Sequence, residues 1–138
     1  MRVILLIMIG LSLAHAEFIR DEINEVVLDT RTHLVWQDDV ESKTILKNFV
    51  GALSYCETLN LGGHSDWHLP SFNELYYLAD RSKYNPSLSA TFQNVALSYY
   101  WSSTTNASNS SGAWVVRFYN GGDGTYHKAT SNSVRCVR

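Results

Sequence analysis

Helical periodicity is confined to the middle of this chain, and short β-prone runs lie on both sides of it. Apolar residues recur at spacings of three and four over 44–59, which predicts an amphipathic helix with Cys56 on its apolar face. A second helix is predicted after Pro70, because Ser71 followed by Glu74 has the pattern of a capping box. Helices and strands that are segregated along the chain in this way are typical of an α+β domain rather than of alternating βαβ units.

The β-prone runs predict two sheet regions. Residues 25–29 and 33–37, separated by a polar turn, predict an N-terminal β-hairpin. Beyond a predicted loop over 85–97, four runs predict a C-terminal antiparallel β-meander, with a glycine-rich turn at 120–124. These four runs are 99–103, 113–119, 125–129 and 133–138. A length of 138 residues suits one such domain and not two.

The N-terminus has the features of a secretory signal peptide over residues 1–16. Arg2 supplies a positive charge, an apolar stretch runs from Val3 to Leu13, and Ala14-His15-Ala16 places small residues where signal peptidase cleaves. This stretch is too short for a membrane anchor, since a helix needs about 20 residues to span the bilayer. We therefore expect cleavage after Ala16 and a mature domain over 17–138. The expected location is periplasmic or secreted, without stable membrane insertion.

Two cysteines, Cys56 and Cys136, are present in the chain. Outside the cytosol an even pair of cysteines more often forms a disulfide than a metal or catalytic site. We predict an intramolecular bridge that ties the last strand to an early helix. Two free thiols or one intermolecular link remain the alternatives.

Several ordered motifs resemble the Lcl C-terminal domain family of secreted bacterial proteins, over about 25–138. The resemblance rests on the following segments in order: Trp36-Gln37, 52–59, 61–75 with Asp66-Trp67-His68-Leu69-Pro70, 100–104, 113–118 and 134–138. Two positions depart from the pattern, because His68 stands where arginine is usual and His33 where glycine is usual. The resemblance implies a single C-type-lectin-like domain, distantly related to the formylglycine-generating enzymes. It also implies a module that binds sulfated glycans or extracellular matrix.

Catalysis and metal binding are not predicted. His64, Asp66 and His68 alternate as metal ligands on a strand would, but loop packing explains them better, and arginine is usual at the third position. The turn at 120–124 lacks the closing glutamate of a calcium loop, so calcium through backbone carbonyls is an alternative that we do not predict. No acid, base or nucleophile constellation emerges, and we expect neither an enzyme nor a cofactor.

Candidate binding residues lie in the C-terminal strands. Along 113–119, Trp114, Val116 and Phe118 share the face that we assign to the core, which leaves Arg117 and Tyr119 at the surface. Tyrosine rings offer flat faces to sugars, and basic side chains offer charge-assisted bonds to sulfate or carboxylate. The predicted glycan site therefore comprises Arg117, Tyr119, Tyr126 and Lys128, with His127, Arg135 and Arg138 as further basic candidates.

Net charge limits the choice of partner. At −2, the chain has no overall attraction for nucleic acid, and its basic residues must cluster locally to bind any polyanion. The first alternative to a glycan-binding module is a periplasmic accessory protein with a protein partner. The second alternative is a divergent enzyme of the formylglycine-generating type. The oligomeric state is not predicted.

Overall fold

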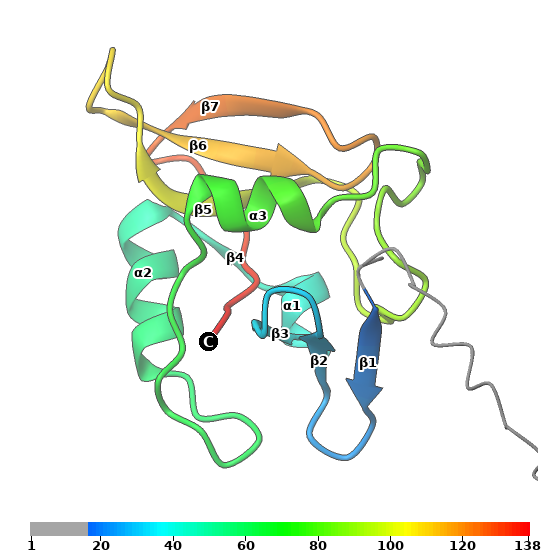
Figure 1. The fold of residues 1–138 in the computed structure, drawn as a ribbon. Helices are drawn as coiled ribbons and strands as arrows, with labels where there is room; N and C mark the ends of the chain where they lie inside the picture. The colour runs from blue at the N-terminus through cyan, green and yellow to red at the C-terminus, as the bar shows by residue number, and fades with distance from the viewer. Residues whose placement is uncertain (1–16) are drawn as a thin grey trace, which may run out of the picture.

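A computed structural model describes residues 17–138 (Figure 1). The predicted signal peptide, residues 1–16, lies outside the described residues. Within the described part, the molecule combines a three-stranded sheet, three short helices and a five-stranded sheet. Among its helices none is long and apolar enough to cross a membrane.

The N-terminal sheet is antiparallel, in the order β1-β2-β3, with β1 at Phe18–Asp21, β2 at Val26–Asp29 and β3 at Val35–Gln37. The predicted hairpin is confirmed as β2 and β3, with Val27 opposite Trp36. Strand β1 was not predicted. It pairs with β2 over its full length, and its residues are alternately half-buried and exposed. Two of its four residues, Arg20 and Asp21, are charged, so the sequence shows no alternation of apolar and polar residues there.

The helices are α1 (Glu41–Thr44), α2 (Phe49–Thr58) and α3 (Phe72–Leu78). The predicted helix over 44–59 was wrong in its first part, because residues 45–48 are not helical and include strand β4 (Leu46–Lys47). Asn48 is the physical reason for the later start. Its side chain accepts a hydrogen bond of 2.8 Å from the Gly51 N–H and so caps α2 at that point. Ser71 is the N-cap of α3, and the predicted capping box with Glu74 is confirmed.

The second sheet has the strand order β4-β8-β5-β6-β7, with β5 at Tyr99–Thr105, β6 at Gly112–Arg117, β7 at Asp123–His127 and β8 at Asn132–Ser133. Strands β5, β6 and β7 form the predicted antiparallel meander. Strand β8 does not continue this meander beyond β7. It pairs in parallel with β5 and antiparallel with β4, so the sheet is mixed and the fully antiparallel prediction was wrong.

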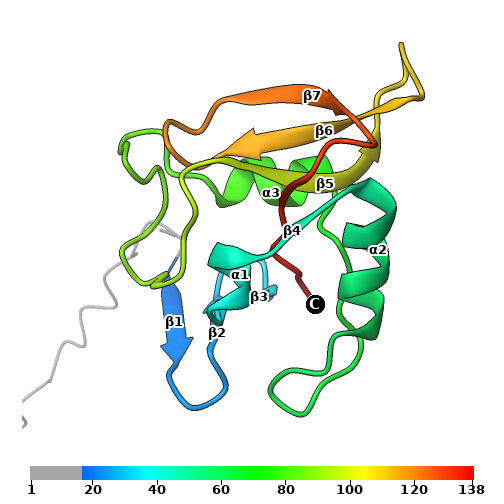
Figure 2. The same cartoon turned by 180° about the vertical axis from the view of Figure 1, so that it is seen from behind.

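The C-terminal segment after β8 lies between α2 and the N-terminal sheet in both views (Figures 1 and 2). A strand is predicted over 133–138, but within that range only Ser133 belongs to β8. The rest bonds to β3 instead: Gln37 N donates to Cys136 O at 3.0 Å and Val35 N to Arg138 O at 2.8 Å. This segment therefore joins the two sheets, which explains why residues 134–137 are all buried.

Two apolar clusters form the core. One contains Tyr100, Val116 and Phe118 with side chains of α3, and the other contains Trp101 and Val115 with side chains of α2. Val116 and Phe118 are thus core residues as predicted. Val115, on the opposite face of β6, is also fully buried, because α2 and the C-terminal segment cover that face.

The predicted disulfide is confirmed between Cys56 on α2 and Cys136 in the C-terminal segment, with no free cysteine elsewhere in the described part. Both residues are fully buried, and 80 residues separate them in sequence. The bridge therefore links the centre of the molecule to the helix that covers the second cluster.

Candidate functional site

Three of the predicted binding residues come together around Tyr99. Arg117 on β6 is the register partner of Tyr99 on β5. The Arg117 guanidinium carbon lies 5.7 Å from the centre of the Tyr99 ring and 5.0 Å from that of Tyr119. The ring centres of Tyr99 and Tyr126 are 5.0 Å apart. We call these four residues, Tyr99, Arg117, Tyr119 and Tyr126, the aromatic ledge.

Strand register explains why the ledge forms on one face of the sheet. Tyr126 pairs with Ala113, which lies four residues from Arg117 and so shares its face. Gly124, which pairs with Val115, has no side chain that could cover the surface near Tyr126. A Cβ atom at Gly124 would have no heavy atom within 4 Å outside residues 123–125. The surface over β7 is therefore open.

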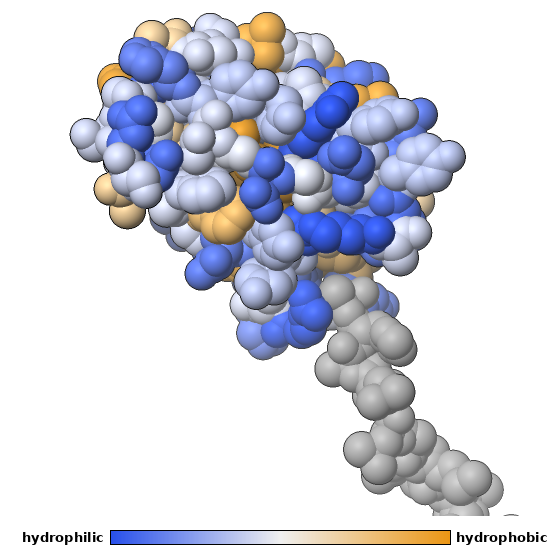
Figure 3. Space-filling view, turned by 90° about the horizontal axis from the view of Figure 1, so that it is seen from above, coloured by the Kyte–Doolittle hydropathy of each residue, from blue (hydrophilic) through white to orange (hydrophobic). Residues whose placement is uncertain are grey.

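The exposure and charge of the ledge suit a polar ligand. Tyr119 and Tyr126 are each 36% exposed, and Arg117 is half-buried. Within residues 17–138 no carboxylate lies within 4.0 Å of the Arg117 guanidinium, so its charge is not neutralised by an ion pair. Figure 3 looks down on the β6–β7 side of the molecule. It shows a mainly blue to pale surface with orange only in small separate areas.

Lys128, the fourth predicted residue, lies apart from the Arg117 contacts. Its ammonium group is 4.7 Å from the centre of the Phe49 ring, and its carbonyl accepts a 3.0 Å hydrogen bond from Phe49 N. Lys128 is thus fixed against the first turn of α2. It also has no carboxylate partner in the described part of the chain, and it follows Tyr126 by two residues.

The further basic candidates do not join the ledge. Arg135 is completely buried and forms an ion pair with Asp38, so its prediction as a basic binding candidate was wrong. Arg138 binds Asp66 through two hydrogen bonds of 2.6 and 3.2 Å. The Arg138 hydrogen bond lowers the pKa of the Asp66 carboxyl below its ordinary value. His127 is exposed, and its Nδ1 accepts a hydrogen bond from Ala129 N.

The three alternating residues considered as metal ligands diverge. Asp66 faces Arg138, and His68 Nε2 lies 3.4 Å from Glu74 Oε1. His64 lines a cleft that is described next. Over residues 17–138 no group of three or more His, Cys, Asp or Glu side chains is placed to hold a metal ion.

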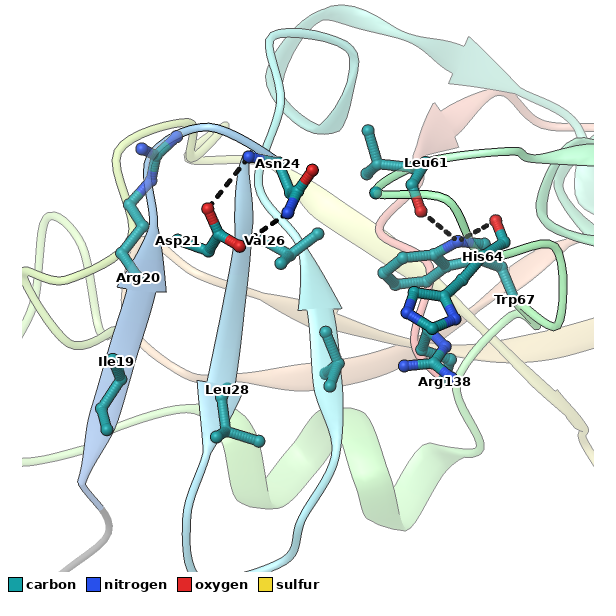
Figure 4. A pocket seen from close by; sticks show the side chains of 12 residues that line it. Ile19, Arg20, Asp21, Asn24, Val26, Leu28, Leu61, His64, Trp67 and Arg138 are labelled. Carbon is teal, nitrogen blue, oxygen red and sulfur yellow. Dashed lines mark hydrogen bonds between the residues drawn. The ribbon is translucent and has the colours of Figure 1, made fainter.

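A cleft of about 310 Å³ lies between the N-terminal sheet and the turn at 61–64 (Figure 4). Apolar side chains form much of its lining, and these are Ile19, Val26, Leu28, Val35, Leu61 and Trp67. The Trp67 ring is fixed because its Nε1–H donates to the carbonyls of Leu61 and His64, at 3.3 and 3.1 Å. Asp21 and Asn24 lie at the hairpin end of the cleft, and hydrogen bonds from the Asn24 backbone and side chain lower the pKa of Asp21.

Tyr99 is the ledge residue that is not among the predicted binding residues. Its run, 99–103, was assigned to a strand, but nothing local indicates which strand lies beside it. Tyr99 and the buried Trp101 lie on the same face of β5, because they are two residues apart. That Tyr99 lies beside Arg117 follows only from the register between β5 and β6.

Comparison with protein families gives a match over most of the chain. The profile of the Lcl C-terminal domain matches residues 25–138, which include every described helix and all of the aromatic ledge. Strand β1, at 18–21, precedes the matched region. A search among curated proteins found no match.

Proposed function

Because this chain belongs to the Lcl C-terminal domain family, we propose that it acts as a non-catalytic binding module for sulfated polysaccharide at cell or matrix surfaces. The aromatic ledge and Lys128 form the binding surface. In this proposal the domain is secreted or periplasmic after cleavage at Ala16. We also infer a C-type-lectin-like fold, which family membership and the order of the elements support.

The observation that carries the proposal is the position of Arg117 between two tyrosine rings without a carboxylate partner. A guanidinium binds sulfate or carboxylate oxygens with two parallel hydrogen bonds, and this geometry favours a planar or tetrahedral anion. The rings of Tyr119 and Tyr126 offer flat faces on which the C–H side of a sugar can stack. A sulfated sugar combines both chemistries in one ligand.

The roles of other reactive side chains support a binding role rather than catalysis. Ser102, beside Trp101, donates its hydroxyl hydrogen to the Trp114 carbonyl at 2.7 Å and is fully buried. Both cysteines are joined in the disulfide, so neither is available as a nucleophile. A buried disulfide also favours an oxidising compartment, in agreement with the proposed location.

The test is binding to immobilised heparin, the sulfated polysaccharide used as probe. Replacing Arg117 and Lys128 together by alanine is expected to abolish retention at about 0.15 M salt, because both unpaired cations are lost. Wild-type retention is expected to fall as salt rises. Lys43→Ala is a control for the loss of an exposed cation, because it removes one on α1, away from the ledge.

Two outcomes contradict the proposal. Undiminished retention of a folded Arg117→Ala/Lys128→Ala variant would exclude this surface, and absence of wild-type retention would exclude the ligand class. Arg117→Lys is a useful intermediate variant, because it keeps the charge and loses the planar fork.

The cleft in Figure 4 favours a second candidate function, an accessory protein with a protein partner. Its apolar lining beside a sheet of which Ile19 is half exposed has the size and chemistry to accept an apolar side chain. This candidate predicts no affinity for heparin, so the same retention experiment separates the two functions.

A further inference from the structure

We propose that the polysaccharide site extends beyond the ledge, as a track of cations and tyrosines that ends in a pocket beside Arg31. The inference rests on the proposed function and concerns the length of chain that the domain binds. The track consists, in order, of Arg117, Tyr119, Tyr84, Arg81, Lys83 and Arg31.

The first link joins the ledge to the segment that follows α3. Asn85 N donates to Tyr119 O at 2.7 Å, which holds this segment against the end of β6. The ring centres of Tyr84 and Tyr119 are 6.5 Å apart, and Tyr84 is 74% exposed. In Figures 1 and 2 the segment after α3 lies beside the turn between β6 and β7. Tyr84 therefore continues the line of tyrosine rings from the half-buried Tyr99 through the exposed Tyr119.

The second link is Arg81. Its Nε–H donates to Gly121 O at 3.0 Å, and its Nη1 donates to Tyr76 O at 2.8 Å. The guanidinium lies 3.6 Å from the centre of the Tyr76 ring. Gly121 has φ +75°, and a side chain there would come within 2.8 Å of Arg81 Cγ, so this glycine makes room for the arginine. Both of these bonds go to carbonyls, and in the described part of the chain no carboxylate lies within 4.0 Å of Arg81, so no ion pair offsets its charge.

The track ends in a pocket of about 450 Å³ between α3 and the turn that connects β2 to β3. Its lining brings together Arg81 and Lys83, from the segment after α3, with Arg31 from that turn. Tyr77, on the exposed side of α3, also lines it and is 69% exposed. The pocket thus repeats the combination of cation and open tyrosine ring that characterises the ledge.

The charge of this pocket favours an anion. Asp80 is the single carboxylate among its lining residues, against three cations. The Ser82 hydroxyl and backbone N–H lower the pKa of Asp80, and Lys83 Nζ lies 4.0 Å from it. Arg31 has no carboxylate within 4.0 Å in the part of the chain that the structure describes. A polyanion that leaves the ledge along Tyr84 therefore meets unneutralised positive charge at the far end.

The experiment compares the affinities of size-defined heparin oligosaccharides by isothermal titration calorimetry, with protein expressed from the full-length sequence. A disaccharide reaches the ledge alone, so we expect affinity to rise with chain length until the pocket is also filled. Arg31→Ala is expected to weaken binding of the longest chain about tenfold, the loss typical of one charge-assisted contact. The same variant is expected to bind the disaccharide as the wild type does. Lys43→Ala is the control for loss of one exposed cation.

The outcomes separate the track from the ledge. If Arg117→Ala abolishes binding while Arg31→Ala and Lys83→Ala both keep wild-type affinity for the longest chain, the track is overturned and the ledge stands. A disaccharide affinity equal to that of the longest chain would also overturn the track. If the wild type binds no oligosaccharide, the proposed function itself fails. Because Arg31 and Lys83 are exposed and lie on different segments, the two variants provide independent tests if one of them does not fold.

Discussion

At the scale of single residues, the buried carboxylate of Asp38 is the main polar contact between distant segments. It accepts hydrogen bonds from Arg20 Nε at 2.8 Å and from Arg135 Nη1 at 3.2 Å. The backbone N–H groups of Gln93 and Asn94 donate to the same carboxylate, at 2.9 and 3.1 Å. Burial on its own would lower the pKa of Arg20, but the hydrogen bond and charge of Asp38 outweigh it and raise that pKa. One side chain thus joins β1, a loop and the C-terminal segment.

Replacing Asp38 by asparagine is expected to lower the free energy of unfolding by about 3–5 kcal/mol, because two arginines then lose their buried counter-charge. Urea unfolding followed by tryptophan fluorescence measures the loss. Asp66→Asn is the control, since it breaks an ion pair with Arg138 at the surface, where water screens the charges, and little change is expected. Equal losses in the two variants would contradict the role assigned to Asp38.

The backbone at His33 adopts a conformation that suits glycine better than histidine. His33 has φ +62°, in the left-handed region that favours glycine, and it lies in the turn between β2 and β3. His33→Gly removes a steric penalty of about 1 kcal/mol in the folded state. Part of this gain in stability is lost, because glycine increases the conformational entropy of the unfolded chain. We expect a small increase in the free energy of unfolding, measured by urea titration. Thr32→Gly, in the same turn, is the control, and it is expected to lower stability because no positive φ is relieved. A stabilising Thr32→Gly or a strongly destabilising His33→Gly would contradict this account.

At the scale of elements, α3 depends on its capping box because it has only seven residues. Ser71 Oγ accepts from Glu74 N at 3.1 Å, and Glu74 Oε1 accepts from Ser71 N at 2.8 Å. The helix carries Leu75 and Leu78 into the first core cluster. Its start therefore decides where these side chains pack.

Ser71→Ala is expected to cost about 1 kcal/mol of stability, since the Glu74 N–H loses its partner at the helix start. Thermal unfolding by circular dichroism gives the measurement. Asn73→Ala, on the exposed side of the same helix, provides the matched control with little expected effect. The prediction fails if both variants melt together with the wild type.

At the scale of the whole molecule, the disulfide and the C-terminal segment hold the two sheets together. Cys136 lies between Arg135 and Val137. The backbone of Val137 forms antiparallel β-bridges with Trp36 and with His68. The bond to Cys56 then fixes this segment to α2. Closing 80 residues of chain removes much of the freedom of the unfolded state.

Replacing both cysteines by alanine is expected to lower the free energy of unfolding by about 2–5 kcal/mol. Alanine is used instead of serine, because serine would place two hydroxyl groups in an apolar site. The alanine variant therefore measures the loss of the disulfide bond. Urea unfolding of oxidised wild type, reduced wild type and the double variant measures the effect. Agreement between reduced protein and variant is expected, and a variant as stable as the oxidised wild type would contradict it.

Features that depend on neighbouring residues could be predicted from the amino-acid sequence. The β2–β3 hairpin follows from two short runs and a polar turn, and α3 from Ser71 and Glu74 three residues apart. The meander of β5 to β7 follows from alternating residues and a glycine turn. The disulfide pairing followed from there being two cysteines in the chain. In each case the stabilising contacts are local, or the choice of partner is unique.

Contacts between distant segments could not be predicted in the same way. The pairing of β8 with β4 and β5, the burial of Arg135 and the place of Tyr99 beside Arg117 all involve residues far apart in sequence. The same is true of Arg81 against Gly121, on which the proposed track depends. A local pattern states that a residue is apolar or charged and on which face of its own element it lies. It cannot name the partner across a long loop, because that choice depends on the packing of the whole chain.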